Sequence, residues 1–177
     1  MSGHSHWKQI QQKKGTADIK RGQIFSKLLA AISIAARNEP NPDFNPRLRS
    51  AVEKAKENQV PLDNIERAIK KASETKNLEE IIVEAYGPEK VAIIIEGITD
   101  NKNRSISEIR TILNENGAKM AEQGSVLWSF DPPAGGNHEW IAKFKQAISD
   151  DGKQKIAALI EKLEGHNDVQ KVTTNSQ

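Results

Sequence analysis

The chain has 177 residues, of which 36% are hydrophobic and 28% charged, and it contains no cysteine. The lack of cysteine excludes disulfides, thiolate metal sites and cysteine nucleophiles, and it is typical of the reducing cytoplasm. No stretch approaches the roughly 18–20 continuous apolar residues of a membrane helix, and the polar start of the chain has no apolar secretory region. We therefore expect a cytoplasmic protein with no membrane segment.

The charge is divided unevenly along the chain. Residues 1–76 carry a net charge of +7, and residues 77–177 carry a net charge of −5. Within the first part, residues 1–37 contain seven Lys or Arg and a single acid, Asp18. A basic part joined to an acidic part indicates that the basic one meets a polyanion, although chance segregation of solvated charge produces the same pattern.

The chain begins with a basic stretch that contains one aromatic residue, Trp7. We expect this stretch to be a mobile arm that ends at Lys14. Thr16 is suited to cap a first helix, and apolar residues recur at helical spacing from Phe25 to Ala36. The sequence therefore predicts a basic arm followed by an amphipathic helix.

Two more short helices complete the predicted amino-terminal domain. Asn45 and Pro46 are typical of an N-cap followed by the first helical residue. A third amphipathic helix is predicted from Pro61, and residues 73–77 read as a polar linker. We expect residues 1–76 to form a three-helix bundle preceded by the basic arm.

From Leu78 onward the hydrophobic pattern is that of strands. Two runs of β-branched residues, 81–86 and 91–98, flank Gly87-Pro88 and predict a β-hairpin. Ser105, with Glu108 three residues later, is typical of a capping box at the start of a helix.

The remaining pattern predicts a third strand at 125–130, a helix at 153–164 and a last short strand from residue 168. Residues 77–177 are therefore expected to form an α+β, ferredoxin-like domain, with a mainly antiparallel sheet and two helices. The Pro- and Gly-rich stretch at 131–150 reads as a connector that interrupts this domain.

Lysine, arginine and asparagine residues near Trp7 or near a helix start are the candidate nucleic-acid-binding residues. Each of these residues taken alone fits ordinary solvated surface, and only the clustering favours a phosphate contact. The set is Trp7, Lys8, Lys13, Lys14, Lys20, Arg21, Lys27, Arg47, Arg49, Asn101, Lys102 and Arg104.

No pattern in the chain indicates an enzyme. There is no Gly-rich phosphate loop and no nucleophile motif. His4 and His6 lack a third ligand at metal-site spacing, and Glu84 and Glu96 are expected to face solvent from neighbouring strands. We expect no catalytic site, metal, cofactor or small-molecule substrate.

Several motifs that occur together in this order resemble the YebC/PmpR family. The amino-terminal ones are Gly3-His-Ser-His-Trp7, Lys20-Arg21-Gly-Gln-Ile-Phe25-Ser-Lys27-Leu28, Asn45-Pro-Arg47-Leu-Arg49 and Pro61-Leu-Asp-Asn-Ile-Glu-Arg-Ala-Ile-Lys-Lys71. The later ones are Glu84-Ala-Tyr86-Gly-Pro88, Asp100-Asn-Lys-Asn-Arg104, Gly124-Ser-Val-Leu-Trp128-Ser-Phe130 and Asp168-Val-Gln-Lys-Val172.

The resemblance implies a helical amino-terminal domain, α+β domains after it, and no catalytic activity or cofactor. It also implies one of two roles, since bacterial members are described as DNA-binding transcriptional regulators and related members as translational activators at the ribosome that ease synthesis of proline-rich stretches. Typical members carry a further α+β domain where this chain has only residues 131–150, so this chain resembles a shortened member.

Three functions therefore stay open at this point. The first is a DNA-binding transcriptional regulator, and the second is a translation factor that binds ribosomal RNA. The third, compatible with both, is a protein–protein adaptor that uses the acidic α+β part. The sequence predicts no oligomeric state.

Overall fold

The structure is a computed structural model that describes residues 3–74, 77–134 and 139–177, with side chains described from Ala17 onward. Its contacts divide the chain into two compact units, Met1–Lys76 and Asn77–Gln177. Each unit has its own hydrophobic core.

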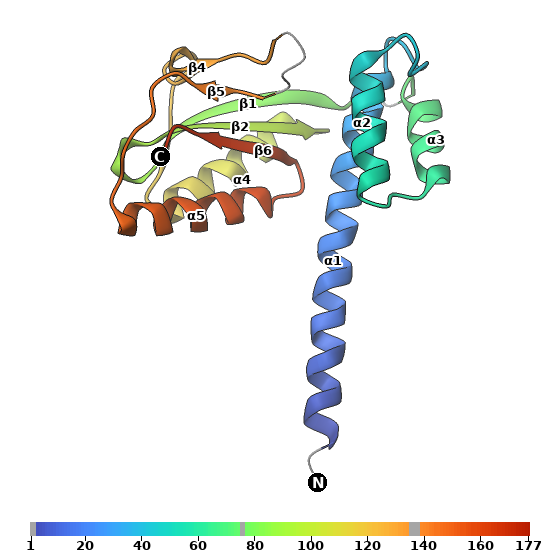
Figure 1. Ribbon diagram of the computed structural model, residues 1–177, viewed down its shortest axis with the longest axis horizontal. Coiled ribbons are helices and arrows are strands. Elements are labelled where there is room, and N and C mark those ends of the chain that lie inside the picture. The colour runs from blue at the N-terminus through green and yellow to red at the C-terminus, as the bar shows by residue number, and fades with distance from the viewer. Residues whose placement is uncertain (1–2, 75–76, 135–138) are drawn as a thin grey trace. The chain divides into compact units, whose positions relative to one another are not determined.

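The first helix of the amino-terminal unit, α1, runs from Gly3 to Ala36 (Figure 1). The predicted helix start at Thr16 and the arm before it are therefore wrong. Residues 3–36 contain no proline, and after Gly3 their glycines are Gly15 and Gly22. A single glycine costs about 1 kcal/mol relative to alanine, whereas ending and restarting a helix repeats the unfavourable nucleation step.

Two shorter helices, α2 (Pro46–Glu57) and α3 (Leu62–Lys71), pack against the carboxyl-terminal part of α1. The predicted cap of α2 is confirmed, because the Asn45 side chain accepts a hydrogen bond from the Leu48 amide at 3.0 Å. The side-chain Nδ2 of Asn45 donates to the carbonyls of Ala35 at 2.7 Å and Glu39 at 2.8 Å. Asn45 thus ties the end of α1 to the start of α2.

The core of this unit contains Leu28, Ile32, Leu48, Val52, Ala55, Val60 and Ile65. On α1 the buried side chains begin at Leu28, and residues 17–22 are exposed. The predicted apolar stripe is confirmed, but it occupies only the carboxyl-terminal third of a much longer helix.

The second unit contains a four-stranded sheet in the order β3-β1-β2-β6, with every pair antiparallel. The strands are β1 (Glu79–Tyr86), β2 (Ala92–Thr99), β3 (Lys119–Met120) and β6 (Val169–Thr174). The predicted hairpin is confirmed as β1 and β2, joined through a short 3-10 turn at Pro88–Lys90.

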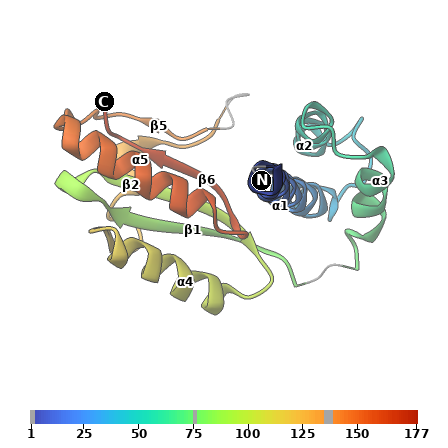
Figure 2. The ribbon, with the colours of Figure 1, turned by 90° about the horizontal axis from the view of Figure 1, so that it is seen from below.

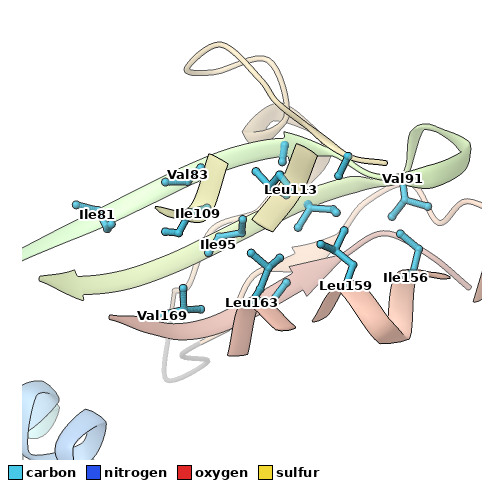
Figure 3. Packing of buried hydrophobic residues seen from close by; sticks show 14 residues of the cluster. Ile81, Val83, Val91, Ile95, Ile109, Leu113, Ile156, Leu159, Leu163 and Val169 are labelled. Carbon is cyan, nitrogen blue, oxygen red and sulfur yellow. The ribbon is translucent and has the colours of Figure 1, made fainter. Parts of the chain in front are cut away.

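Two helices, α4 (Lys102–Glu115) and α5 (Asp150–Glu164), cover one face of this sheet (Figures 1 and 2). Alternate residues of β1 and β2, such as Val83 and Ile95, point into the core against Leu113 and Leu159 (Figure 3). The α+β class and the antiparallel sheet with two helices are confirmed. The connectivity differs from the β-α-β-β-α-β order of a ferredoxin-like domain, because β1 and β2 follow each other directly.

The opposite face of the sheet is covered by a two-stranded ribbon, β4 (Phe130–Asp131) and β5 (Ile141–Ala142). Figure 1 shows this ribbon on the other side of the sheet from α4 and α5. Phe130, Trp140 and Ala142 pack on Ala92 and Ile94 of β2. The predicted connector at 131–150 thus contributes its own layer to the unit.

The predicted strand at 125–130 is wrong for most of its length. Residues Leu127–Ser129 form a 3-10 turn, and only Phe130 continues into β4. The cause is Glu84 on β1, whose carboxylate accepts hydrogen bonds from the amides of Gly124 at 2.5 Å, Val126 at 2.6 Å and Leu127 at 2.9 Å. Amides that converge on one carboxylate cannot alternate as a strand ladder requires.

Glu84 itself is only 4% exposed, so the expectation that it faces solvent is also wrong. It lies on the same sheet face as Glu96, which is half-buried beside Trp140. Burial raises the pKa of Glu96 above its ordinary value, although the nearby Lys171 opposes this effect.

Two helix starts also differ from the prediction. α4 begins after Asn101, whose side chain accepts from the Arg104 amide at 3.1 Å, so Ser105 lies inside the helix rather than at its cap. α5 begins at Asp150, three residues earlier than predicted, because the Ser149 hydroxyl accepts from the Gly152 amide at 3.0 Å.

Replacing Glu84 with glutamine is expected to destabilise the second unit by about 2 kcal/mol or more, because the single oxygen of a neutral amide cannot replace two carboxylate oxygens as the acceptor of three backbone amides. Urea unfolding followed by circular dichroism measures the loss, and amide exchange at Gly124, Val126 and Leu127 locates it. Glu79→Gln, an exposed change on the same strand, is the control. Unfolding midpoints and amide exchange rates that stay at wild-type values in Glu84→Gln would contradict this role.

Candidate nucleic-acid interface

The cationic side of α1 is formed by Lys20, Arg21 and Lys27 among the described side chains. Lys20 and Arg21 are exposed, and Lys27 is half-buried. Lys20 and Lys27 are seven residues apart, which places them on one side of the helix about 10 Å apart along its axis. The Arg21 guanidinium lies 5.2 Å from the centre of the Phe25 ring, at the point where the core begins.

The other predicted residues of the amino-terminal stretch are Trp7, Lys8, Lys13 and Lys14. Their backbone belongs to α1, and their side chains lie outside the described residues. The structure therefore places these four positions and the cationic side of α1 in one continuous helix instead of a helix and a separate arm.

The two arginines of α2 have different environments. Arg47 is exposed in the first turn of the helix. Arg49 donates from Nε to the carbonyl of Pro42 at 3.2 Å and from Nη2 to the carbonyl of Asp43 at 2.8 Å. Because these bonds hold the turn between α1 and α2, Arg49 has a structural task that the sequence did not reveal.

Helix α3 presents a mixture of charges to solvent. A shallow surface hollow along it is lined by Asp63, Glu66, Arg67, Lys70, Lys71 and Glu74. Acids and bases are equal in number there, so the hollow has no net attraction for a polyanion. Of the three helices of this unit, α1 carries the clearest excess of positive charge.

The predicted cluster at Asn101, Lys102 and Arg104 belongs to the second unit. Asn101 is used as the N-cap of α4, and Lys102 is exposed. Arg104 donates from Nη2 to Asp100 Oδ1 and Asp168 Oδ2, each at 2.9 Å. Hydrogen bonds to Asp168 and then to Asp100 raise the pKa of Arg104, and they occupy the guanidinium that was expected to contact phosphate.

Asp168, which sequence reasoning missed as a structural residue, is the centre of this cluster. Its Oδ2 accepts from Ser105 Oγ at 2.6 Å, Arg104 Nη2 at 2.9 Å and Thr99 Oγ1 at 3.2 Å. Burial raises the pKa of Asp168, but the hydrogen bonds from Ser105 and Arg104 outweigh burial and hold the pKa of this carboxyl below its ordinary value.

Glu108, His166 and Asp168 bring three potential metal-ligand atoms within 4.8 Å of one another. Both ring nitrogens of His166 are already engaged, Nε2 with Glu108 Oε2 at 2.8 Å and Nδ1 with the Asp168 amide at 3.1 Å. The Arg104 guanidinium also lies against the Asp168 carboxylate. A cation would have to compete with these partners, so the group fits an internal network better than a metal site.

Asp168→Asn is expected to cost about 1–3 kcal/mol of unfolding free energy at pH 7, because three donors lose a charged acceptor. The folded pKa is lowered, so this stabilisation is present above the unfolded value of about 3.9 and is lost as the pH falls through the folded pKa. Urea unfolding across the pH range measures it.

Asp100, the exposed acid that also accepts from Arg104, supplies the control. Asp100→Asn is expected to lower the free energy of unfolding by less than about 1 kcal/mol. A difference between Asp168→Asn and wild type that stays constant from pH 7 to pH 3 would contradict the assignment.

No helix within the described ranges is both long and apolar enough to cross a bilayer. Residues 5–75 match the family model for the TACO1/YebC protein N-terminal domain, and residues 78–135 match the model for the TACO1/YebC second and third domain.

Three relatives illustrate the likeness. A "Probable transcriptional regulatory protein" of Desulfosudis oleivorans is 46% identical over 161 residues, which cover 89% of this chain and 63% of the relative. One of Geobacter sulfurreducens is 50% identical over 135 residues, covering 74% of this chain and 55% of the relative. The crystal structure of a conserved hypothetical protein from Aquifex aeolicus matches with a TM-score of 0.80 at 30% identity, covering 90% of this chain and 91% of that one.

The chain therefore spans between about half and two thirds of the length of these curated relatives. The two family models nevertheless match most of its residues, and the fold agrees with the solved structure. The chain belongs to the TACO1/YebC family.

Proposed function

We propose that this chain is a non-catalytic, nucleic-acid-binding regulator of transcription in the cytoplasm, and that the cationic side of α1 contacts the phosphate backbone of DNA. One observation carries the proposal. Residues 17–22 of α1 are exposed, and Lys20 and Arg21 lie there on a helix whose buried residues begin only at Leu28. Charged helix surface that does not contribute to the core is available to a polyanion.

The environments of the other candidate cations also favour α1 as the helix that contacts phosphate. Arg49 and Arg104 were candidates from the sequence, but both are held by internal oxygen acceptors. Lys20 and Arg21 are exposed, as Arg49 and Arg104 are, and a single acid, Asp18, lies among the seven cations of residues 1–37. In this proposal the contact with the phosphate backbone of DNA comes from residues 1–76.

The relatives' names agree with this proposal, because they describe probable transcriptional regulatory proteins. We further propose that the chain is a shortened family member in which residues 131–150 replace a whole domain. The support is that the family match ends at residue 135 and that the ribbon β4–β5 occupies this part of the chain. Functions that reside on the additional domain of longer relatives would then be absent.

A translational activator that binds ribosomal RNA is the second candidate. It is favoured by the mixed charge of α3, which gives no evident helix for reading base edges in a DNA groove. Contacts from α1 to phosphates carry no sequence information and suit structured RNA equally well. In this version the target is recognised by shape, and the protein eases synthesis of difficult sequences.

The double variant Lys20→Gln, Arg21→Gln is expected to weaken binding to a 30-base-pair DNA duplex. It should also reduce the salt dependence, by about one unit of slope for each phosphate that the variant no longer neutralises. Fluorescence anisotropy at four salt concentrations measures both quantities. Lys54→Gln, Lys56→Gln removes the same charge from exposed positions of α2 and is expected to have a much smaller effect. Equal slopes for the two double variants would overturn the assignment to α1.

The same assay separates the two functions when genomic DNA, random DNA and a ribosomal RNA hairpin are compared at physiological salt. A transcriptional regulator is expected to bind particular genomic fragments at least about a thousandfold more tightly than random DNA. Weak, uniform DNA binding with tight binding to the hairpin would favour the translational role.

A further inference from the structure

The ribbon side of the second unit carries three exposed aromatic side chains that lie together. Trp128 is 62% exposed, Phe144 59% and Tyr86 40%. The Trp128 and Phe144 rings have centres 5.8 Å apart and are tilted by 47°. Tyr86 Oη and Trp128 Nε1 both donate to the carbonyl of Ser125, each at 2.8 Å. We call Tyr86, Trp128 and Phe144 the aromatic platform.

The platform is held rigidly although it is exposed. The Glu84 carboxylate fixes the backbone of residues 124–127 immediately before Trp128. The carbonyl of Phe144 accepts from Asn175 Nδ2 at 3.1 Å, and Asn175 is itself buried. Rings fixed in this way lose little conformational entropy when a flat ligand stacks on them.

The platform is also unusual for this chain, which has only eight aromatic residues. Three of them lie on this surface, while Phe130 and Trp140 from the same segment face the core. Single exposed hydrophobic residues need no explanation, but adjoining ones mark contact surfaces.

Three lysines are neighbours of the ring-bearing residues in the sheet or in the sequence. Lys119 is opposite Tyr86 in the register of β1 and β3, and Lys143 Nζ donates to the carbonyl of Trp128 at 3.5 Å. Lys145 directly follows Phe144 and is exposed. Glu84 is buried against amides, and Asp131 pairs with Lys143 at 3.4 Å, so that this pair adds no net charge. Glu122 is the exposed acid of the same turn.

Exposed rings accompanied by cations are the chemistry that binds single-stranded nucleic acid, in which bases stack on aromatic faces and the backbone follows positive charge. We propose that the aromatic platform binds unpaired bases of single-stranded nucleic acid, with Lys119 and Lys145 beside the strand. The inference builds on the proposed nucleic-acid function, but it concerns a second surface, on the other unit, with a different ligand.

The test compares binding of the full chain to fluorescent 12-nucleotide strands, one of deoxythymidine and one of uridine, and to the 30-base-pair duplex. Trp128→Leu and Phe144→Leu are each expected to weaken binding of a 12-mer by between about fivefold and about a hundredfold, since each removes a stacking ring. The salt slope should stay unchanged, because neither variant removes a cation that neutralises phosphate. The deoxythymidine and uridine strands distinguish DNA from RNA as the source of the bases.

Two control variants test whether a loss of binding comes from the missing ring or from a change in folding. Trp128→Phe keeps an aromatic face without the indole nitrogen and is expected to retain affinity within about threefold. Phe44→Leu removes a ring that is 76% exposed on the other unit and should leave binding of the 12-mer unchanged. Rescue by phenylalanine but not leucine shows that a ring is required, which a merely structural role for Trp128 would not explain.

The outcomes separate this inference from the proposed function. If both leucine variants bind the 12-mers as tightly as wild type while Lys20→Gln, Arg21→Gln loses affinity, the platform serves another partner and the inference is overturned, but the function of α1 stands. If the wild-type chain binds the duplex but neither 12-mer, the inference about the platform is likewise overturned and the function of α1 stands. Failure of the wild-type chain to bind any of these ligands overturns both proposals.

Discussion

The outer layer of the second unit depends on the bond between one buried carboxylate and three backbone amides. Glu84 is 4% exposed and accepts from Gly124, Val126 and Leu127. A buried carboxylate is stable only when its oxygens are satisfied in this way. By gathering these amides it turns the chain at residues 124–129, so that Phe130 enters the core and Trp128 stays outside. Both the packing of the β4–β5 ribbon and the exposure of the aromatic platform follow from that turn.

Asp168 has a comparable effect at the carboxyl-terminal end of β2. It collects Thr99, Arg104 and Ser105, and its carbonyl accepts from the Ile98 amide at 2.8 Å. A side chain at Gly97 would meet that carbonyl at 2.8 Å, so glycine permits the close approach. In the second unit, therefore, the motif residues Glu84, Arg104 and Asp168 stabilise the fold. The exposed cations of α1 are better placed to bind a ligand, and this contrast favours a division of labour between the two units.

Local rules predicted the elements whose determinants are close in sequence. The β1–β2 hairpin followed from two β-branched runs about Gly87-Pro88, and the start of α2 from Asn45-Pro46. The errors arose where distant or competing partners decide. The strand predicted at 125–130 does not form because Glu84, 40 residues before Gly124, binds the backbone amides there. Ser105 was predicted to cap a helix, but its hydroxyl instead donates to Thr99 and Asp168. For the same reason the set of candidate nucleic-acid-binding residues was too large. The sequence showed the positive charge of Arg49 and Arg104, but not the oxygen atoms of this chain to which they donate hydrogen bonds.

The central claim is that α1, and not the start of α4, contacts the polyanion. Hydrogen–deuterium exchange of the full chain with and without a saturating DNA duplex tests it most directly. Slower exchange is predicted within α1, which binding would hold in its helical form. Little change is predicted at residues 99–108, where the amides of Asn101, Arg104 and Ser105 already donate to Thr99 or Asn101. Slower exchange at 99–108 with no change in α1 would contradict the claim and would place the nucleic-acid contact on the second unit.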